Sequence, residues 1–148
     1  MEADGSLLDV ITHEMGHVLG VGTLWDDFGL RKDFPGHNPI YVGPAALKAF
    51  GTLVGEPPGT VPSAGSHWRE SVFDSELMSP SIDGNDNPLS RVTVASLQYL
   101  GYTVDLDAAE PYALPNLLAV ARSGRVLAAE PRRVMLPTIP SRIPAEAP

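Results

Sequence analysis

The sequence contains no cysteine among its 148 residues. A disulfide framework and a thiolate zinc site are therefore both excluded, and any metal would have to be bound by imidazole or carboxylate groups. Histidine is also scarce, with only four in the chain, so few ligand sets are possible. The lack of cysteine does not by itself identify a compartment.

Long apolar runs are missing as well, and no segment is hydrophobic enough to span a bilayer. The first ten residues, MEADGSLLDV, lack the positive start and the apolar centre of a signal peptide. We therefore expect either a cytoplasmic protein or a chain whose natural beginning lies upstream.

Basic residues are outnumbered, and the formal net charge of −8 argues against a nucleic acid as the partner. Residues 1–110 carry 16 acidic and 5 basic side chains, whereas residues 111–148 carry 2 acidic and 5 basic ones. This change of sign predicts two different segments. The first is the main domain over residues 1–110, and the second is a Pro-rich C-terminal extension or linker over residues 111–148.

A first helix is predicted over residues 6–19. Ser6 can cap its start, Asp9 completes a pattern like a capping box, and Gly20 stands where a left-handed residue is needed. Apolar side chains recur at the spacing of one broad helical face. They are Leu7, Leu8, Ile11, Met15, Val18 and Leu19.

A second helix is predicted over residues 90–100, between Ser90 as its cap and Gly101 as its stop. Residues 21–66 are rich in glycine and proline and predict ordered loop with, at most, short strands and one short helix at residues 44–50. Loops of this length inside a compact domain are usually functional. The expected fold class is therefore mainly α with long ordered loops.

The segment THEMGHVLG places His13 and His17 one helical turn apart on the same face. Both imidazoles can then aim at one zinc ion, about 2.0–2.1 Å from each nitrogen. Glu14 is offset around the helix, so it cannot easily join the ligands but can reach a water at the metal. This HExxH pattern favours a zinc metalloprotease over the alternative, a surface helix that carries these residues by chance.

Two histidines do not hold a catalytic zinc, so a third ligand is needed. His37 in FPGHNP and His67 in SAGSHWRE are the histidine candidates, and Glu76 is the best placed acidic one. The polar turn IDGNDNP lacks the spacing of an EF-hand, which favours a turn over a calcium site.

The motif and the residues after it resemble the leishmanolysin-like metallopeptidases, a group of metzincin zinc endopeptidases. HEMGHVLGVGTLW begins as a metzincin motif does, but Thr23 stands where the usual third histidine would be. Leishmanolysin-like enzymes share this departure and place the third histidine after an insertion, followed by a methionine turn. GSHWRE with His67, ELMSP with Met78, and PLSRVTVASLQYLGYTVD fit that pattern over roughly residues 5–115.

The resemblance implies a zinc endopeptidase that hydrolyses peptide or protein substrates through a zinc-activated water. It implies three zinc ligands, a general base, a turn that redirects the chain and a floor beneath the metal. These are His13, His17 and His67, then Glu14, Gly20 and Met78. It also suggests an extracellular or cell-surface location. Leishmanolysin itself is rich in cysteine, so this chain is expected to be closer to bacterial-type relatives.

Metzincin catalytic domains begin with a sheet whose edge strand binds the peptide, whereas here the motif helix starts at about residue 6. We therefore expect the C-terminal part of a metzincin-like catalytic domain that lacks its N-terminal sheet subdomain and is weak or inactive alone. Some of Leu7, Leu8, Ile11 and Met15 should then be exposed. Two alternatives are a non-catalytic zinc-stabilised binding or structural module, and a gluzincin-like peptidase with Glu76 as a ligand.

Overall fold

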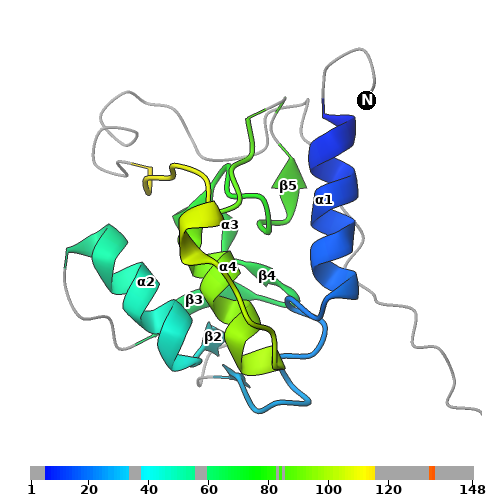
Figure 1. Cartoon of the computed structure of the whole chain (residues 1–148). Helices are drawn as coiled ribbons and strands as arrows, with labels where there is room; N and C mark the ends of the chain where they lie inside the picture. Colours follow the sequence, from blue (N-terminus) through cyan, green and yellow to red (C-terminus); the bar gives the residue numbers. More distant parts are fainter. Residues whose placement is uncertain are drawn as a thin grey trace, which may run out of the picture.

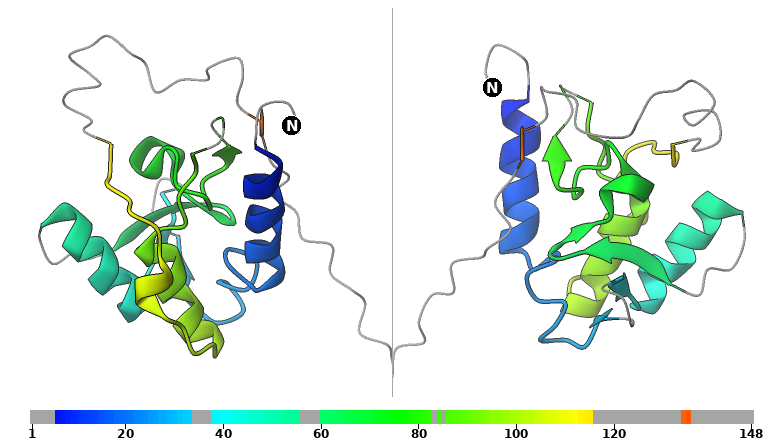
Figure 2. Two further views of the ribbon diagram at one scale, coloured as in Figure 1. Left: turned by 45° about the horizontal axis from the view of Figure 1, so that its top comes forward. Right: turned by 180° about the vertical axis from the view of Figure 1, so that it is seen from behind.

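The computed structural model describes residues 6–33, 38–55, 60–82, 84, 86–115 and 134–135. Helix α1 (Leu7–Val18) stands along one side of the molecule and α2 (Pro44–Val54) along the opposite side, with α4 (Arg91–Ser96) between them (Figure 1). The two further views show the same separation of α1 from α2 (Figure 2). The short helices are α3 (Glu70–Phe73), η2 (Leu97–Leu100) and η3 (Leu106–Ala108).

Short strands form a four-stranded antiparallel sheet in the order β1-β2-β3-β4. Their bounds are β1 (Arg31–Lys32), β2 (Ile40–Tyr41), β3 (Val61–Ala64) and β4 (His67–Trp68). A separate antiparallel pair joins β5 (Ser81–Ile82) to β6 (Val134–Met135). Four of these six strands lie in or beside residues 21–66, where ordered loop with at most short strands was expected. Strands of two to four residues are too short to show a clear alternation in the sequence, so their positions could not be predicted.

An aromatic cluster forms the centre of the core. Trp25 and Trp68 are fully buried with their ring centroids 4.6 Å apart, and Phe73 stacks on Trp68 at 5.5 Å. Tyr41 meets Trp68 edge to face at 5.3 Å. Large aromatic side chains contribute much of the burial energy of a small core. Because Trp68 belongs to β4, this packing also holds the preceding residue, His67, in place.

Helix α1 agrees with the predicted helix to within one residue at each end, but its predicted capping is wrong. Ser6 makes no side-chain capping bond, and the Asp9 carboxylate instead accepts a hydrogen bond of 2.8 Å from the side-chain amide of Asn87. Gly20 has a φ of +104°, which confirms the predicted left-handed residue after the helix.

The predicted second helix is also found, as α4 continuing into η2. Ser90 caps it by accepting a 3.3 Å hydrogen bond from the backbone N–H of Thr93, and Gly101 ends it with a φ of +96°. Helix α2 begins at Pro44 as predicted but runs to Val54, past the predicted end. Most of the predicted C-terminal extension, residues 116–133 and 136–148, lies outside the described part of the chain.

Apolar side chains of α1 are exposed on the outer side of the helix. Leu8 and Val18 are 71% and 85% exposed, and Leu7, Ile11 and Met15 are exposed as well. The expected exposure of this face is thus confirmed, and a contiguous apolar face of this kind favours association. Within the described residues, no helix has the length and apolarity that crossing a membrane would require.

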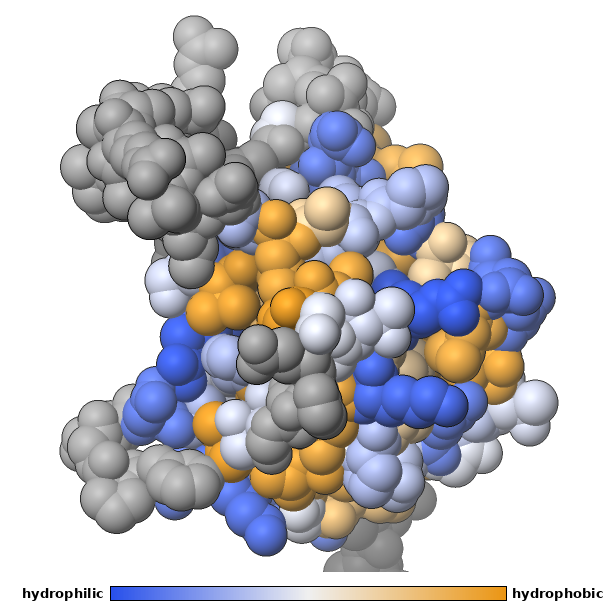
Figure 3. Space-filling model, turned by 90° about the vertical axis from the view of Figure 1, so that its left-hand side faces the viewer, coloured by the Kyte–Doolittle hydropathy of each residue, from blue (hydrophilic) through white to orange (hydrophobic). Residues whose placement is uncertain are grey.

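The side of the molecule that carries α2 has an apolar hollow. Viewed from that side, apolar side chains gather among hydrophilic ones (Figure 3). A cavity of about 270 Å³ lies between α2 and the segment that follows η3, and its lining includes Leu53 and Tyr112. It contains no histidine, so it is separate from the HExxH motif.

Candidate metal centre

Three histidines meet at one point between α1 and β4. The Nε2 atom of His67 lies 3.2 Å from Nε2 of His13 and 3.0 Å from Nε2 of His17. The ligand atoms of all three lie within 4.8 Å of one another, and no other such group of three occurs in the described residues. The tertiary structure therefore brings together the three histidines that the resemblance singled out.

The outer nitrogen of each α1 histidine is tied to a backbone carbonyl. Nδ1 of His13 lies 2.6 Å from the Leu77 carbonyl oxygen, and Nδ1 of His17 lies 2.9 Å from that of Val21. A carbonyl can only accept, so we assign the ring proton of each neutral imidazole to Nδ1. Hydrogen bonds of this kind orient the imidazole of a metal-binding histidine.

This assignment leaves lone pairs on Nε2 of His13 and His17, both aimed at Nε2 of His67. A single N–H on His67 could satisfy only one of them, whereas a divalent cation satisfies all three nitrogens. Three imidazole nitrogens suit zinc, which takes nitrogen ligands and keeps a further position open in catalytic sites. The residues present therefore fit a zinc ion.

Burial keeps two of these imidazoles neutral. It lowers the pKa of His13 to about 4, with the Leu77 carbonyl opposing the change and His17 adding to it. Burial also lowers the pKa of His67 to about 3, with further lowering by His17 and His13. Because only the neutral imidazole binds a metal, both groups are ready to do so at neutral pH.

These pKa values predict how the metal-free protein responds to acid. The unfolded chain takes up protons on His13 and His67 below pH 6.5, but the folded chain does not until about pH 4 and 3. The free energy of unfolding should therefore fall as the pH drops from about 6.5 towards 4. Urea midpoints measured with a chelator at pH 7.5, 6 and 5 test this, and His67→Asn should flatten the dependence. A midpoint that rises on acidification would contradict it.

Glycine at two positions lets the three segments of the centre approach. A Cβ atom on Gly22 would lie 1.7 Å from the Ser66 carbonyl oxygen, and Gly22 has a φ of +75°. The chain leaving α1 therefore passes directly over the turn between β3 and β4, next to His67. Gly16 similarly allows the Met78 sulfur to pack against α1, where an added Cβ would lie 2.6 Å from it. Sequence reasoning missed both glycines, whose only signal is their place within and just after the motif.

Gly22→Ala should destabilise the protein and weaken metal binding together. The left-handed backbone alone costs about 1–3 kcal/mol for a side chain, and the overlap with Ser66 must also push the turn away from α1. Gly29→Ala is a matched control, since Gly29 has a φ of +64° but nothing within 4 Å of its added Cβ. Urea denaturation and zinc titration should show the larger loss for Gly22→Ala, and equal losses would contradict this role.

Met78 lies beneath α1 and is fully buried. Its carbonyl oxygen accepts a 3.1 Å hydrogen bond from the backbone N–H of Trp68, which ties the methionine turn to β4. Since Gly16 directly precedes His17, the side chain of Met78 packs next to the histidine-bearing turn of the helix. Its role is packing, as the resemblance implies for a floor residue.

The other candidates fall in different places. Glu76 is fully buried and accepts hydrogen bonds from Met78, Ser90 and Thr93, so the structure does not bring it to the histidines as a ligand. His37 lies outside the described residues. Glu14 is half-buried on α1 beside His13.

Thr23 takes the position where the usual metzincin motif has its third histidine. Its hydroxyl donates a 2.8 Å hydrogen bond to the His17 carbonyl oxygen at the end of α1. It therefore supports the turn after the helix, with Gly20 at a φ of +104°.

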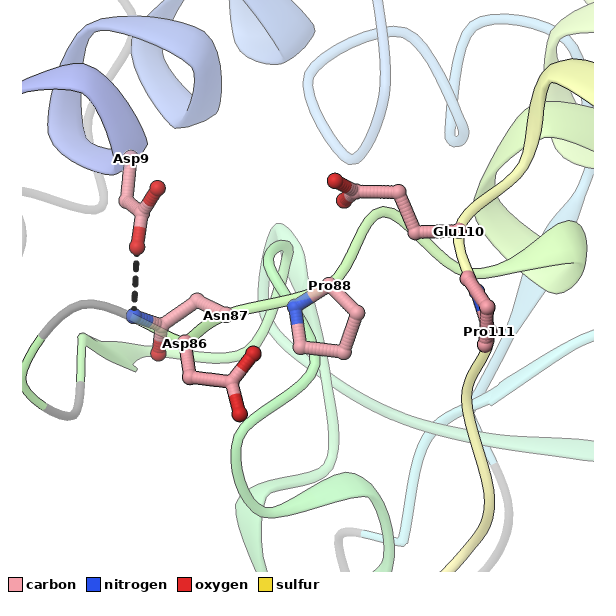
Figure 4. Close-up of a pocket in the computed structure, with 6 residues that line it drawn as sticks. All are labelled: Asp9, Asp86, Asn87, Pro88, Glu110 and Pro111. Carbon is pink, nitrogen blue, oxygen red and sulfur yellow. Dashed lines mark hydrogen bonds between the residues drawn. The ribbon is translucent and has the colours of Figure 1, made fainter.

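A pocket of about 330 Å³ lies beside α1, lined by Asp9, Asp86, Asn87, Pro88, Glu110 and Pro111 (Figure 4). The Asn87 amide donates to the Asp9 carboxylate across it, and Glu110 accepts a hydrogen bond from the backbone N–H of Leu89. The first bond connects Asn87 to α1 and the second connects Leu89 to the chain after η3, which is a structural role.

Comparison with known proteins adds nothing to this geometry: no family model matches the chain, and no curated protein does.

Proposed function

We propose that this chain is the zinc-binding part of a metalloendopeptidase of the leishmanolysin-like type. One observation carries the proposal: three imidazole Nε2 atoms, from His13, His17 and His67, converge while the outer nitrogens of the two α1 histidines are held by carbonyls. Such a set of three histidines with an open further position is typical of catalytic rather than structural zinc.

In the proposed reaction, each residue of the site has its own role. The three histidines would hold the metal, which when bound polarises a carbonyl and lowers the pKa of water to about 7. Glu14 directly follows His13 on α1 and is partly exposed. Its carboxylate can accept the proton of the attacking water and return it to the leaving amine, as a general base and then acid. Met78 and the buried core keep the ligands in place while the proton moves.

A non-catalytic zinc module is the second candidate, because the histidines come from distant segments of the chain. His17 and His67 are 50 residues apart in sequence and come from α1 and β4. A metal that joins distant segments of a small domain adds to its folding free energy whether or not it catalyses a reaction. Only the endopeptidase needs Glu14, since a structural zinc needs no base.

Zinc content and peptide cleavage by the same preparation test the proposal. The purified chain should bind one zinc and cleave a denatured protein slowly, and a chelator should stop the cleavage. Long incubation at low protein concentration is appropriate, because the exposed apolar face of α1 favours association. Chelator-sensitive cleavage would contradict the purely structural module, and no zinc at all would overturn both functions.

A further inference from the structure

Glu76 lies at the centre of a buried hydrogen-bond network. Its Oε2 accepts a 2.6 Å hydrogen bond from the backbone N–H of Met78. Its Oε1 accepts from the backbone N–H of Ser90 at 3.1 Å, from the Ser90 hydroxyl at 2.6 Å and from the Thr93 hydroxyl. The residue is fully buried, so these four bonds replace all of its contact with water.

One arm of this network reaches His13. The Met78 N–H bond closes the turn Glu76–Leu77–Met78, and the Leu77 carbonyl in this turn accepts the 2.6 Å hydrogen bond from Nδ1 of His13. The backbone N–H of Leu77 is held in turn by the Pro88 carbonyl oxygen at 3.0 Å. The orientation of the His13 acceptor therefore depends on the Glu76 carboxylate.

A second arm reaches the strand that carries His67. The Thr93 hydroxyl accepts a 2.7 Å hydrogen bond from the indole N–H of Trp68, the residue after His67. The backbone N–H of Trp68 also donates to the Met78 carbonyl oxygen. Trp68 of β4 is thus bonded directly to Met78 on one side and, through Thr93 near the start of α4, to Glu76 on the other.

The carboxyl group of Glu76 is the acceptor for four donors, two backbone N–H groups and two hydroxyls. The Ser90 hydroxyl already accepts from the backbone N–H of Thr93, and the Thr93 hydroxyl accepts from Trp68. Both hydroxyl protons are therefore free to point at Glu76. A glutamine has one acceptor oxygen, and its amide nitrogen would face donors.

We propose that Glu76 is a positioning residue for the metal centre, which orients His13 through the Leu77 carbonyl and His67 through Thr93 and Trp68. The inference rests on the proposed function only for the identity of the metal, since the imidazole positions are properties of the metal-free chain. Partners of this kind change metal affinity by about 10–100-fold when they are removed.

The test compares Glu76→Gln with Thr93→Val in the full chain. Long-range ¹⁵N–¹H NMR of the metal-free protein at pH 7 reports the tautomer of each histidine. Glu76→Gln should lose the slowly exchanging Nδ1–H signal of His13, mix its tautomers and weaken zinc binding about 10–100-fold. Thr93→Val keeps the carboxylate and its bond to Met78, so it should disturb the His67 signals and leave those of His13 nearly unchanged.

Phe50→Leu is the control for general destabilisation, because Phe50 is buried against Phe73 in the core and takes no part in the network. It should lower stability without altering the histidine signals or the zinc affinity. Unchanged histidine signals in folded Glu76→Gln would overturn the inference, as would equal effects of Thr93→Val on His13 and His67. If Glu76→Gln does not fold, the comparison between His13 and His67 in Thr93→Val still decides. A wild-type chain that fails to bind zinc would remove the proposed function but leave the NMR comparison intact.

Discussion

His67→Ala should lower the zinc affinity of the chain by about a hundredfold to several thousandfold. The binding free energy of a structural zinc site is about 10–16 kcal/mol, and three imidazoles would share it here. Losing a third of it costs about 3–5 kcal/mol, at tenfold per 1.4 kcal/mol. His67 is also the only ligand outside α1, and its Nε2 lies 3.2 and 3.0 Å from those of the other two. Without it, two nitrogens of one helix remain.

Competition with a chromogenic chelator at pH 7 measures this loss. His37→Ala is the matched control, because His37 was the other histidine candidate from the sequence and its removal should leave the affinity unchanged. A large loss for His37→Ala with little loss for His67→Ala would assign the third ligand to His37 and refute the centre described above.

Glu14→Gln should remove most of the chelator-sensitive cleavage and leave the zinc content near that of the wild type. General base catalysis contributes about 10²–10⁴-fold to a rate. Glutamine has nearly the same size as glutamate but cannot accept the proton. The metal should stay because Glu14 is not in the group of three ligands.

Parallel measurements of zinc content and cleavage rate decide the role of Glu14. Glu110→Gln is the control, since it also removes a carboxylate from a residue outside the histidine cluster. Near-normal cleavage by Glu14→Gln would rule out the assigned mechanism. Loss of zinc in this variant would instead make Glu14 a ligand or a structural support.

Local patterns in the sequence determined two of the three histidines of the metal centre. Residues four apart in a helix share a face whatever surrounds the helix, so the pairing of His13 with His17 follows from spacing alone. The same holds for the caps at Ser90 and Gly101 and for the left-handed turn at Gly20, because these depend on a few neighbouring residues.

The sequence could not decide between His37, His67 and Glu76 by spacing, because the third ligand comes from a distant segment. Only the tertiary structure brings the β3–β4 turn against the end of α1, at a distance that leaves no room for a Cβ on Gly22. The tertiary structure also buries Glu76 in the core, where its carboxylate accepts four hydrogen bonds instead of binding a metal.

The sequence allowed for short strands in the loop region but could not place them, for a related physical reason. A two-residue strand is stabilised by its partner across the sheet and by the side chains packed on it, and neither is visible in a run of two letters. Contacts within a helix join residues that are close in the sequence, so a short stretch of sequence is enough to predict them. Contacts such as Trp68 on Trp25 and Thr93 on Glu76 depend on how the whole chain packs, and they give the metal centre its geometry.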